Sequence, residues 1–312
     1  MIRHLHPTDS PRLLKFSQSA GRGETCTMLR ALTGGPLGFP IVKYAGRALS
    51  LRAWQRCWVQ IHRGEIQAIL YAGPRSGAQS WEVSELYLKN SSPKLAADLL
   101  EQISIPAVAA GASRIFARVP ANSALSDEAK KVGYSFLYRE HILGTGSSNS
   151  LASNIPTANQ SINLRYREAS DDYRLFKLHN ATTPTNIKQK SGQTIEDWLA
   201  GYEGLGGHTT ELIFDMNNGE IGGMLQQKSI RSGHMFQIKY SNEATSELPE
   251  LILAAVTRSK EDRVTTSVQE FRPMLSHFLL TIGFRQLAEY EVMVKPLAEP
   301  IPEVSPTLAT IG

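Results

Sequence analysis

The sequence predicts an α/β (α+β) protein built from two similar halves, each with a mixed, mostly antiparallel sheet flanked by helices. Three observations predict this fold class. The chain has 312 residues, a length typical of two domains. Short apolar or alternating runs, typical of strands, are interspersed with longer runs of helical periodicity. These runs occur twice in the same order, with an offset of 150 to 155 residues.

Each half begins with a short strand and a helix. Residues 2–5 and 162–165 have strand-like patterns, and each run is followed by an acidic residue, Asp9 or Asp171. Apolar residues with helical spacing come next. Because a carboxylate can cap the free N–H groups at a helix start, the two aspartates predict where the helices begin.

A hairpin follows in each half. The strands predicted for the two hairpins are 58–61 with 66–71 and 212–214 with 221–225. Their turns contain Gly64 and Gly219, which lie 155 residues apart. Glycine adopts the positive φ angles that tight hairpin turns need, so the two turns support the repeat.

The remaining elements of each half are a third strand, a helix, a buried strand, a second helix and a final strand. In the first half they are 86–90, 93–108, 114–119, a helix ending at Gly133, and 136–143; in the second half they are 238–242, 246–259, 264–268, a helix ending at Gly283, and 287–294. The two helix-ending glycines lie 150 residues apart. The alternative is that both halves are simply mixed α/β segments without a true repeat.

The composition shifts divide the chain into four parts. We predict an N-terminal domain over residues 1–143 and a C-terminal domain over residues 162–295. The segment between them, 144–161, is rich in Gly, Ser and Asn and has little apolar surface to bury, so it is predicted to be a polar linker. Residues 296–312 contain four prolines and are predicted to form a Pro-rich tail.

Charge and composition exclude several classes of protein. The net charge of +4 over the whole chain is too small to indicate a nucleic acid or membrane partner. Two cysteines are too few for a disulfide framework, and the histidines are too scattered for a metal site. No apolar run approaches the roughly 20 residues that cross a bilayer, and the N-terminus lacks a secretory pattern. We therefore expect a cytoplasmic protein without a metal.

The order of elements resembles the GNAT acetyltransferase fold. Asn122 stands eleven residues before Gly133-Tyr134, which is the spacing of the family's Asn-to-Gly-Phe helix motif. The second half keeps Gly283-Phe284 but has Arg272 at the Asn position. The resemblance covers about 1–143 and 162–295 and implies a tandem GNAT protein. It also implies acetyl-CoA or another acyl-CoA as co-substrate, and a small-molecule amine as substrate.

The family binds the acyl-CoA pyrophosphate on backbone N–H groups at a helix start, where the helix dipole also favours an anion. The family motif is Gln/Arg-x-x-Gly-x-Gly/Ala, and residues 91–96 take its place in the first half. Ala96 fits the last position, whereas Lys94 replaces the first glycine and Ser91 replaces Gln/Arg. The same residues also suit an ordinary helix start, with Ser92 as N-cap and Pro93 at the first position. The resemblance implies these cofactor-binding residues: Leu88, Ser91, Ser92, Lys94, Leu95, Ala96 and Asn122.

The second half departs further from this motif. Residues 243–248 contain no glycine, and Glu243 and Glu247 would repel a pyrophosphate. The tyrosine that the family often uses to protonate the leaving thiolate is replaced by Ala129 in one half and Leu279 in the other. The N-terminal half is therefore the better candidate site.

A base for the amine is expected on the third strand of the first half, where Glu85 is the candidate catalytic residue. Glu82 and Glu85 point to opposite faces of a regular strand, unless a bulge intervenes. Two functions follow from the resemblance. The first is an acyl-CoA-dependent N-acyltransferase acting on a small amine. The second is a catalytically silent tandem GNAT-like binding or scaffolding protein, because both cradles are degenerate.

Overall fold

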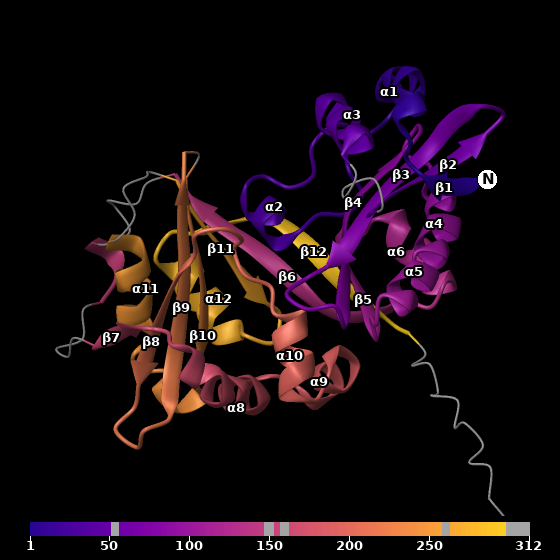
Figure 1. The fold of residues 1–312 in the computed structure, drawn as a ribbon. Coiled ribbons are helices and arrows are strands. Elements are labelled where there is room, and N and C mark those ends of the chain that lie inside the picture. Colours follow the sequence, from indigo (N-terminus) through magenta and orange to yellow (C-terminus); the bar gives the residue numbers. More distant parts are fainter. Residues whose placement is uncertain (51–55, 147–152, 157–161, 232, 258–262, 298–312) are drawn as a thin grey trace, which may run out of the picture.

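The computed structural model describes residues 1–50, 56–146, 153–156, 162–231, 233–257 and 263–297. Its centre is one sheet of twelve strands in the order β1-β2-β3-β4-β5-β12-β6-β11-β10-β9-β8-β7. Figure 1 shows the strands of the first and second halves at opposite ends of this sheet, with helices against both ends. Most of the predicted linker and nearly all of the predicted tail lie outside the described residues.

The predicted elements are found with shifted ends. The strands are β1 (Ile2–His4), β2 (Cys57–His62), β3 (Glu65–Pro74), β4 (Ser80–Leu88), β5 (Arg114–Pro120), β6 (Ser135–Thr145), β7 (Leu164–Tyr166), β8 (Thr210–Asp215), β9 (Ile221–Ile230), β10 (Gly233–Tyr240), β11 (Val264–Gln269) and β12 (Arg285–Pro296). The helices are α1 (Ser10–Ser17), α2 (Met28–Leu32), α3 (Ile41–Leu49), α4 (Ala96–Gln102), α5 (Ser104–Ala109), α6 (Ala124–Lys131), α8 (Asp172–Thr182), α9 (Thr185–Ser191), α10 (Ile195–Gly201), α11 (Leu248–Thr257) and α12 (Pro273–Thr281).

The sheet is mixed and mostly antiparallel, as predicted. Its parallel neighbours are β4 with β5 and β10 with β11, which occupy equivalent places in the two halves. The hairpin turns are also confirmed, because Gly64 and Gly219 have φ angles of 78° and 81°. The repeated topology therefore follows the repeated pattern of the sequence.

One predicted helix is divided. The run from 93 to 108 consists of a 3-10 turn over Pro93–Leu95, then α4, then α5. Pro106 has no N–H with which to reach the carbonyl of Gln102, and α4 ends at Gln102. The apolar periodicity continues through the break, which is why the sequence suggested a single helix.

The two halves exchange their last strands. β12 lies between β5 and β6, and β6 in turn pairs with β11 of the second half. The cores follow the same exchange: Met293 of β12 is buried in the core of the first half, and Leu143 of β6 is buried in the core of the second. The exchanged strands thus make one continuous sheet from two repeated halves.

Candidate functional site

In the first half, the gap between the parallel strands is filled by the chain itself. β4 and β5 pair only over Ser80–Val83 and Arg114–Ala117, and then they part. Residues 20–26 run into this gap. The Glu24 N–H donates to the Leu86 carbonyl at 2.7 Å, and the Cys26 N–H donates to the Arg118 carbonyl at 3.2 Å. The free edges of both strands are therefore occupied by protein backbone.

The predicted cradle next to this gap has few free amides. The N–H groups of Ser91, Ser92, Leu95 and Ala96 each donate to a carbonyl of the chain. Pro93 has no N–H. Ser92 stands at the N-cap position and Pro93 in the first turn, as in the ordinary helix start that was the alternative interpretation, but the Ser92 side chain makes no capping hydrogen bond.

The other predicted cofactor residues lie around the same loop. Lys94 is exposed, and Leu88 is buried in the core of the first half. The Ser91 side chain packs on Gly21, where an added Cβ would lie 2.1 Å from its Oγ. Asn122 has a φ of 61° in the turn before α6. The 20–26 segment thus packs against one side of the predicted cradle, whose Ser91 and Lys94 remain exposed.

Glu85 is engaged in an ion-pair cluster. A bulge between β3 and β4 at Ser84 shifts the register, so Glu85 lies on the same face of the sheet as Glu82. Its carboxylate accepts hydrogen bonds from Lys43, Arg47 and Tyr44. Burial alone would raise the pKa of Glu85, but the hydrogen bonds and charges of Arg47 and Lys43 lower it overall.

A carboxylate whose pKa is lowered is a weak base. Glu85 nevertheless lines a groove of about 330 Å³, together with residues of the 27–43 segment that include Arg30 and Lys43. The groove places Glu85 at a surface that small molecules can reach. Its three partners hold the carboxylate in the charged form and occupy its oxygens.

In the second half, a cavity opens where the parallel strands part. β10 and β11 pair only over His234–Phe236 and Val264–Thr266. Beyond this point a cavity of about 150 Å³ lies between the sheet and the helices α8, α9 and α10. The first half contributes Phe116 and Leu137 to its wall. We call this space the inter-half cavity.

Three titratable side chains gather at the β10 end of the inter-half cavity. Lys239 comes from β10, Arg272 from the start of α12, and His179 from α8. Burial lowers the pKa of Lys239 to about 8 and also lowers the pKa of Arg272. Burial and the charges of Lys239, Arg272 and Lys188 lower the pKa of His179 to about 3, so its imidazole is neutral.

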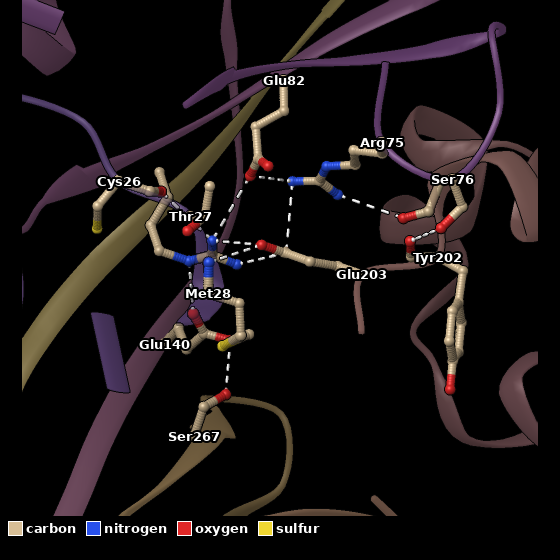
Figure 2. Close-up of polar contacts among 12 residues, drawn as sticks. Cys26, Thr27, Met28, Arg75, Ser76, Glu82, Glu140, Tyr202, Glu203 and Ser267 are labelled. Atoms are coloured by element: carbon tan, nitrogen blue, oxygen red, sulfur yellow. Dashed lines mark hydrogen bonds and ion pairs between the residues drawn. The ribbon is translucent and has the colours of Figure 1, made fainter. Parts of the chain in front are cut away.

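Through Arg75 and Glu203 the cavity also borders a buried charge network of five residues: Arg75, Glu82, Arg118, Glu140 and Glu203. The Arg118 guanidinium is fully buried. It donates to Glu140 Oε2 at 2.8 Å and to both oxygens of Glu203, at 2.8 and 2.7 Å. Figure 2 shows these contacts together with the Ser267 hydroxyl, which donates to Glu140. The network ties the first half to residue 203 of the second.

The network holds three carboxylates for two guanidinium groups. Burial, followed by the neighbouring charge of Glu203, raises the pKa of Glu82 to about 7. Burial opposes ionisation of Glu203 too, but Arg118 and Arg75 hold its pKa well below the usual range. The surplus negative charge is thus removed by protonation of Glu82, the carboxylate with the weaker contacts.

The helix start of the second half differs from that of the first. The N–H groups of Ser246 and Glu247, just before α11, have no acceptor among the described residues. Ser246 carries an exposed hydroxyl that donates to the Glu247 carboxylate. Unpaired amides at the start of a ten-residue helix favour an anion, whereas the carboxylate of Glu247 opposes one.

In the sequence, Arg272 stands out only as a departure from the family motif, and no motif singles out Lys239 or His179. A signal was present, because the offset that aligns Leu86 with Ile238 also aligns Tyr87 with Lys239. A lysine at a position occupied by a buried tyrosine in the other half is unusual. The sequence does not show, however, that α8 and α10 close over it.

Comparison with solved structures tests the fold. A GCN5-related N-acetyltransferase from Sphaerobacter thermophilus aligns with a TM-score of 0.54 and 13% identity over 96% of this chain and 97% of that one. A tandem GNAT protein from the clavulanic acid biosynthesis pathway aligns with a TM-score of 0.52 and 12% identity over 96% and 99%. The chain has the tandem GNAT fold.

A conserved protein of unknown function from Staphylococcus epidermidis is also similar, with a TM-score of 0.52 and 10% identity over 74% of this chain and 92% of that one. No protein-family model matches the sequence, and no curated protein matches it significantly. At these identities the similarity establishes the tandem GNAT fold but not the reaction, because the reaction depends on the residues of the site.

Two other kinds of feature are absent from the described part of the chain. No helix there is long and apolar enough to cross a membrane. Nor do the described histidines, cysteines and acidic residues form a group that could hold a metal ion.

Proposed function

We propose that the protein is an acyl-CoA-dependent N-acyltransferase acting on a small amine, and that its working site is the inter-half cavity. This moves the site from the first half, which the sequence favoured, to the second. The supporting observation is the contrast between the two strand gaps: residues 20–26 fill the first, and the second opens into the cavity. The tandem GNAT fold supports acyl-CoA as the co-substrate.

The cavity suits the deprotonated form of an amine. Lys239 and Arg272 have no carboxylate within ion-pair distance among the described residues, so this end of the cavity is positive. A positive environment lowers the pKa of a bound amine and favours the neutral nucleophile. In the transfer step the amine nitrogen forms a bond to the thioester carbon, the carbon–sulfur bond breaks, and the proton lost by nitrogen goes to the thiolate.

Two side chains can assist this proton transfer. The neutral imidazole of His179 lies at the cavity, with its Nδ1 at 3.1 Å from the Thr183 hydroxyl. Lys239, with a pKa of about 8, is partly neutral near physiological pH and can accept or donate a proton. Replacing Lys239 by Met should reduce the rate and remove an inflection near pH 8 from the pH–rate profile.

Isothermal titration of the full-length protein with acetyl-CoA tests the proposal. We expect micromolar binding and, with an amine present, formation of free thiol that is detectable with a chromogenic disulfide. The matched variants are Lys239→Met in the cavity and Lys43→Met in the Glu85 groove. Loss of turnover in the Lys43 variant alone would place the site in the first half.

A catalytically silent tandem protein is the second candidate. The observation that favours it is the state of both helix starts: the first has most of its amides paired, and the second carries Glu243 and Glu247. This alternative predicts no acetyl-CoA binding at about 1 mM ligand, a level at which even a weak site of about −4 kcal/mol would be half-filled.

A further inference from the structure

Arg272 is a buried cation with no acidic partner among the described residues. It is 8% exposed, and its one hydrogen bond to the described chain runs from Nη1 to the Tyr240 carbonyl at 2.9 Å. Its guanidinium also lies over the rings of Tyr240 and Phe271, at 5.4 and 5.8 Å from their centres. Removing a charge from water is costly unless the charge is paired, so an unpaired buried guanidinium calls for a ligand.

The other buried arginines of this region are all paired. Arg118 contacts three carboxylates, Arg114 bonds Asp197, and Arg75 bonds Glu82. Arg272 differs from them in having only a carbonyl partner, although it lines the same cavity as Asp197 and Glu203. Those two carboxylates are engaged by Arg114 and Arg118, so neither neutralises Arg272.

Lys239 adds a second unpaired cation beside Arg272. Its ammonium lies 4.8 Å from the centre of the Tyr202 ring and 6.0 Å from that of Trp198, and no carboxylate of the described chain lies within 4.0 Å of it. The aromatic rings stabilise the charge only in part. Both cations and the neutral His179 line one end of the cavity. The charge of Glu211 acts on Lys239, but Glu211 is itself ion-paired with Arg167, so this end keeps a net positive charge.

The walls of the inter-half cavity away from this end combine apolar side chains with polar and charged groups that include Asp197 and Glu203. The apolar side chains include Phe116, Leu137, Leu178 and Ile187. A volume of about 150 Å³ is comparable to that of cavities that hold one small organic molecule, about six to ten non-hydrogen atoms. The cavity therefore suits a small ligand with an anionic end and a short apolar body.

We propose that the acceptor is a small amino carboxylic acid, whose carboxylate is bound by Arg272 and Lys239. The planar guanidinium can bind both carboxylate oxygens, and the ammonium supplies a second charge-assisted contact. The amine end of the acceptor then lies near the neutral imidazole of His179, which lines the same end of the cavity. The acceptor role rests on the proposed acyltransferase function, whereas the carboxylate site rests on the cavity alone.

Calorimetry on the full-length protein tests the carboxylate site without acyl-CoA. The probes are 4-aminobutyrate, butyrate and n-butylamine at pH 7 and low salt. We expect the first two to bind and n-butylamine not to bind. Arg272→Met and Lys239→Met each remove a charge-assisted contact, so each should weaken the binding of 4-aminobutyrate by about tenfold or more. The exposed Arg285, changed to Met, is the matched control and should bind as the wild type does.

A stability measurement separates binding from a structural role. Arg272→Met removes an unpaired buried charge, so its melting temperature should equal or exceed that of the wild type, and the effect on binding then belongs to the site. The proposal is overturned if no carboxylate binds at about 10 mM, if n-butylamine binds as well as 4-aminobutyrate, or if Arg272→Met melts earlier and binds equally well. Binding of succinate without 4-aminobutyrate would assign the carboxylate to the acyl group and overturn the acceptor class.

The acyl-transfer arm uses the same probes with acetyl-CoA and mass spectrometry of the products. N-acetylation of 4-aminobutyrate and not of n-butylamine supports both proposals. Carboxylate binding without any acylated product supports the carboxylate site and contradicts the acyltransferase function. Acetylation of n-butylamine without carboxylate binding supports the acyltransferase function and contradicts the carboxylate site. Failure of one proposal can therefore be distinguished from failure of the other.

Discussion

In each half a gap opens at the same place in the topology, between the two parallel strands. Protein backbone fills the gap of the first half, whereas the gap of the second half is open. In the first half, β4 and β5 part after Val83, and backbone from residues 20–26 bonds to both strands. In the second half, β10 and β11 part after Phe236, and a cavity opens between them under α8 and α10. The difference comes from the connection between the first two strands of each half, which enters the gap in one and covers it in the other.

The two halves of this repeat therefore have different structural roles. With its gap filled, the first half forms part of the wall of the inter-half cavity. The 20–26 segment that fills the gap continues into α2, where the Met28 N–H donates to Glu203 of the second half. The open gap leaves the second half with two cations, Lys239 and Arg272, that have no carboxylate within ion-pair distance in the described chain. Each of the following experiments changes one side of the contrast.

Separating the halves should have the largest effect. Residues 1–146 and 153–312 are expected to be insoluble when produced alone, because β5 would have an open edge where β12 belongs and the core would lack Met293. Co-expression should give a stable one-to-one complex with the circular dichroism and melting temperature of the intact chain. Two soluble, independently melting halves would contradict strand exchange.

Breaking the charge network should be the next largest effect. Arg118→Met leaves three buried carboxylates with one guanidinium, and removing one partner of a buried pair typically costs about 3–5 kcal/mol. Urea unfolding followed by circular dichroism measures the change. Arg139→Met, at a more exposed ion pair on β6, is the control and should cost less than about 1 kcal/mol.

The network should also give the protein a specific pH dependence. The pKa of Glu82 is raised to about 7 in the folded state, from the ordinary value of 4.5 that applies to the unfolded chain. Between those pH values the folded protein keeps a proton that the unfolded chain has lost, so this residue's contribution to stability falls as pH rises.

Glu82→Gln mimics the protonated form and should remove this loss. Its advantage over the wild type should be small at pH 5 and should reach on the order of 3 kcal/mol above pH 7. Melting temperatures of both proteins across pH 5–8 give the difference, in which the other titrating groups cancel. A difference that shrinks as pH rises would contradict the direction of the Glu82 shift.

A pair of charge reversals decides which helix start binds acyl-CoA. Glu247→Lys replaces a repelling carboxylate at the start of α11 with an ammonium, a change of two unit charges that are each worth up to about 1 kcal/mol, so it should tighten acetyl-CoA binding by about tenfold. Lys94→Glu, at the start of the first-half helix, should leave binding unchanged. If Lys94→Glu instead weakens binding tenfold and Glu247→Lys has no effect, the cofactor lies in the first half.

Local sequence patterns predicted the mixed sheet, the hairpins at Gly64 and Gly219, and the order of elements in both halves. These features depend on periodicity and turn chemistry within about ten residues, which a sequence displays directly. The patterns also suggested the helix start at Pro93. They could not show that the amides around it are already bonded, since that depends on the local 3-10 geometry.

Tertiary structure alone decided where the candidate site lies. Arg118 meets Glu203 across 85 positions of sequence, and the Thr265 hydroxyl reaches the Leu32 carbonyl across 233. Such contacts leave no periodic trace, because each involves a single side chain on an element whose local pattern is ordinary. The sequence does not reveal the exchange of β6 and β12 either, because a buried apolar strand suits either half of the sheet. The unpaired charges of Lys239 and Arg272 likewise become evident only after packing has buried Arg272 and placed both cations beyond ion-pair distance of every carboxylate of the described chain.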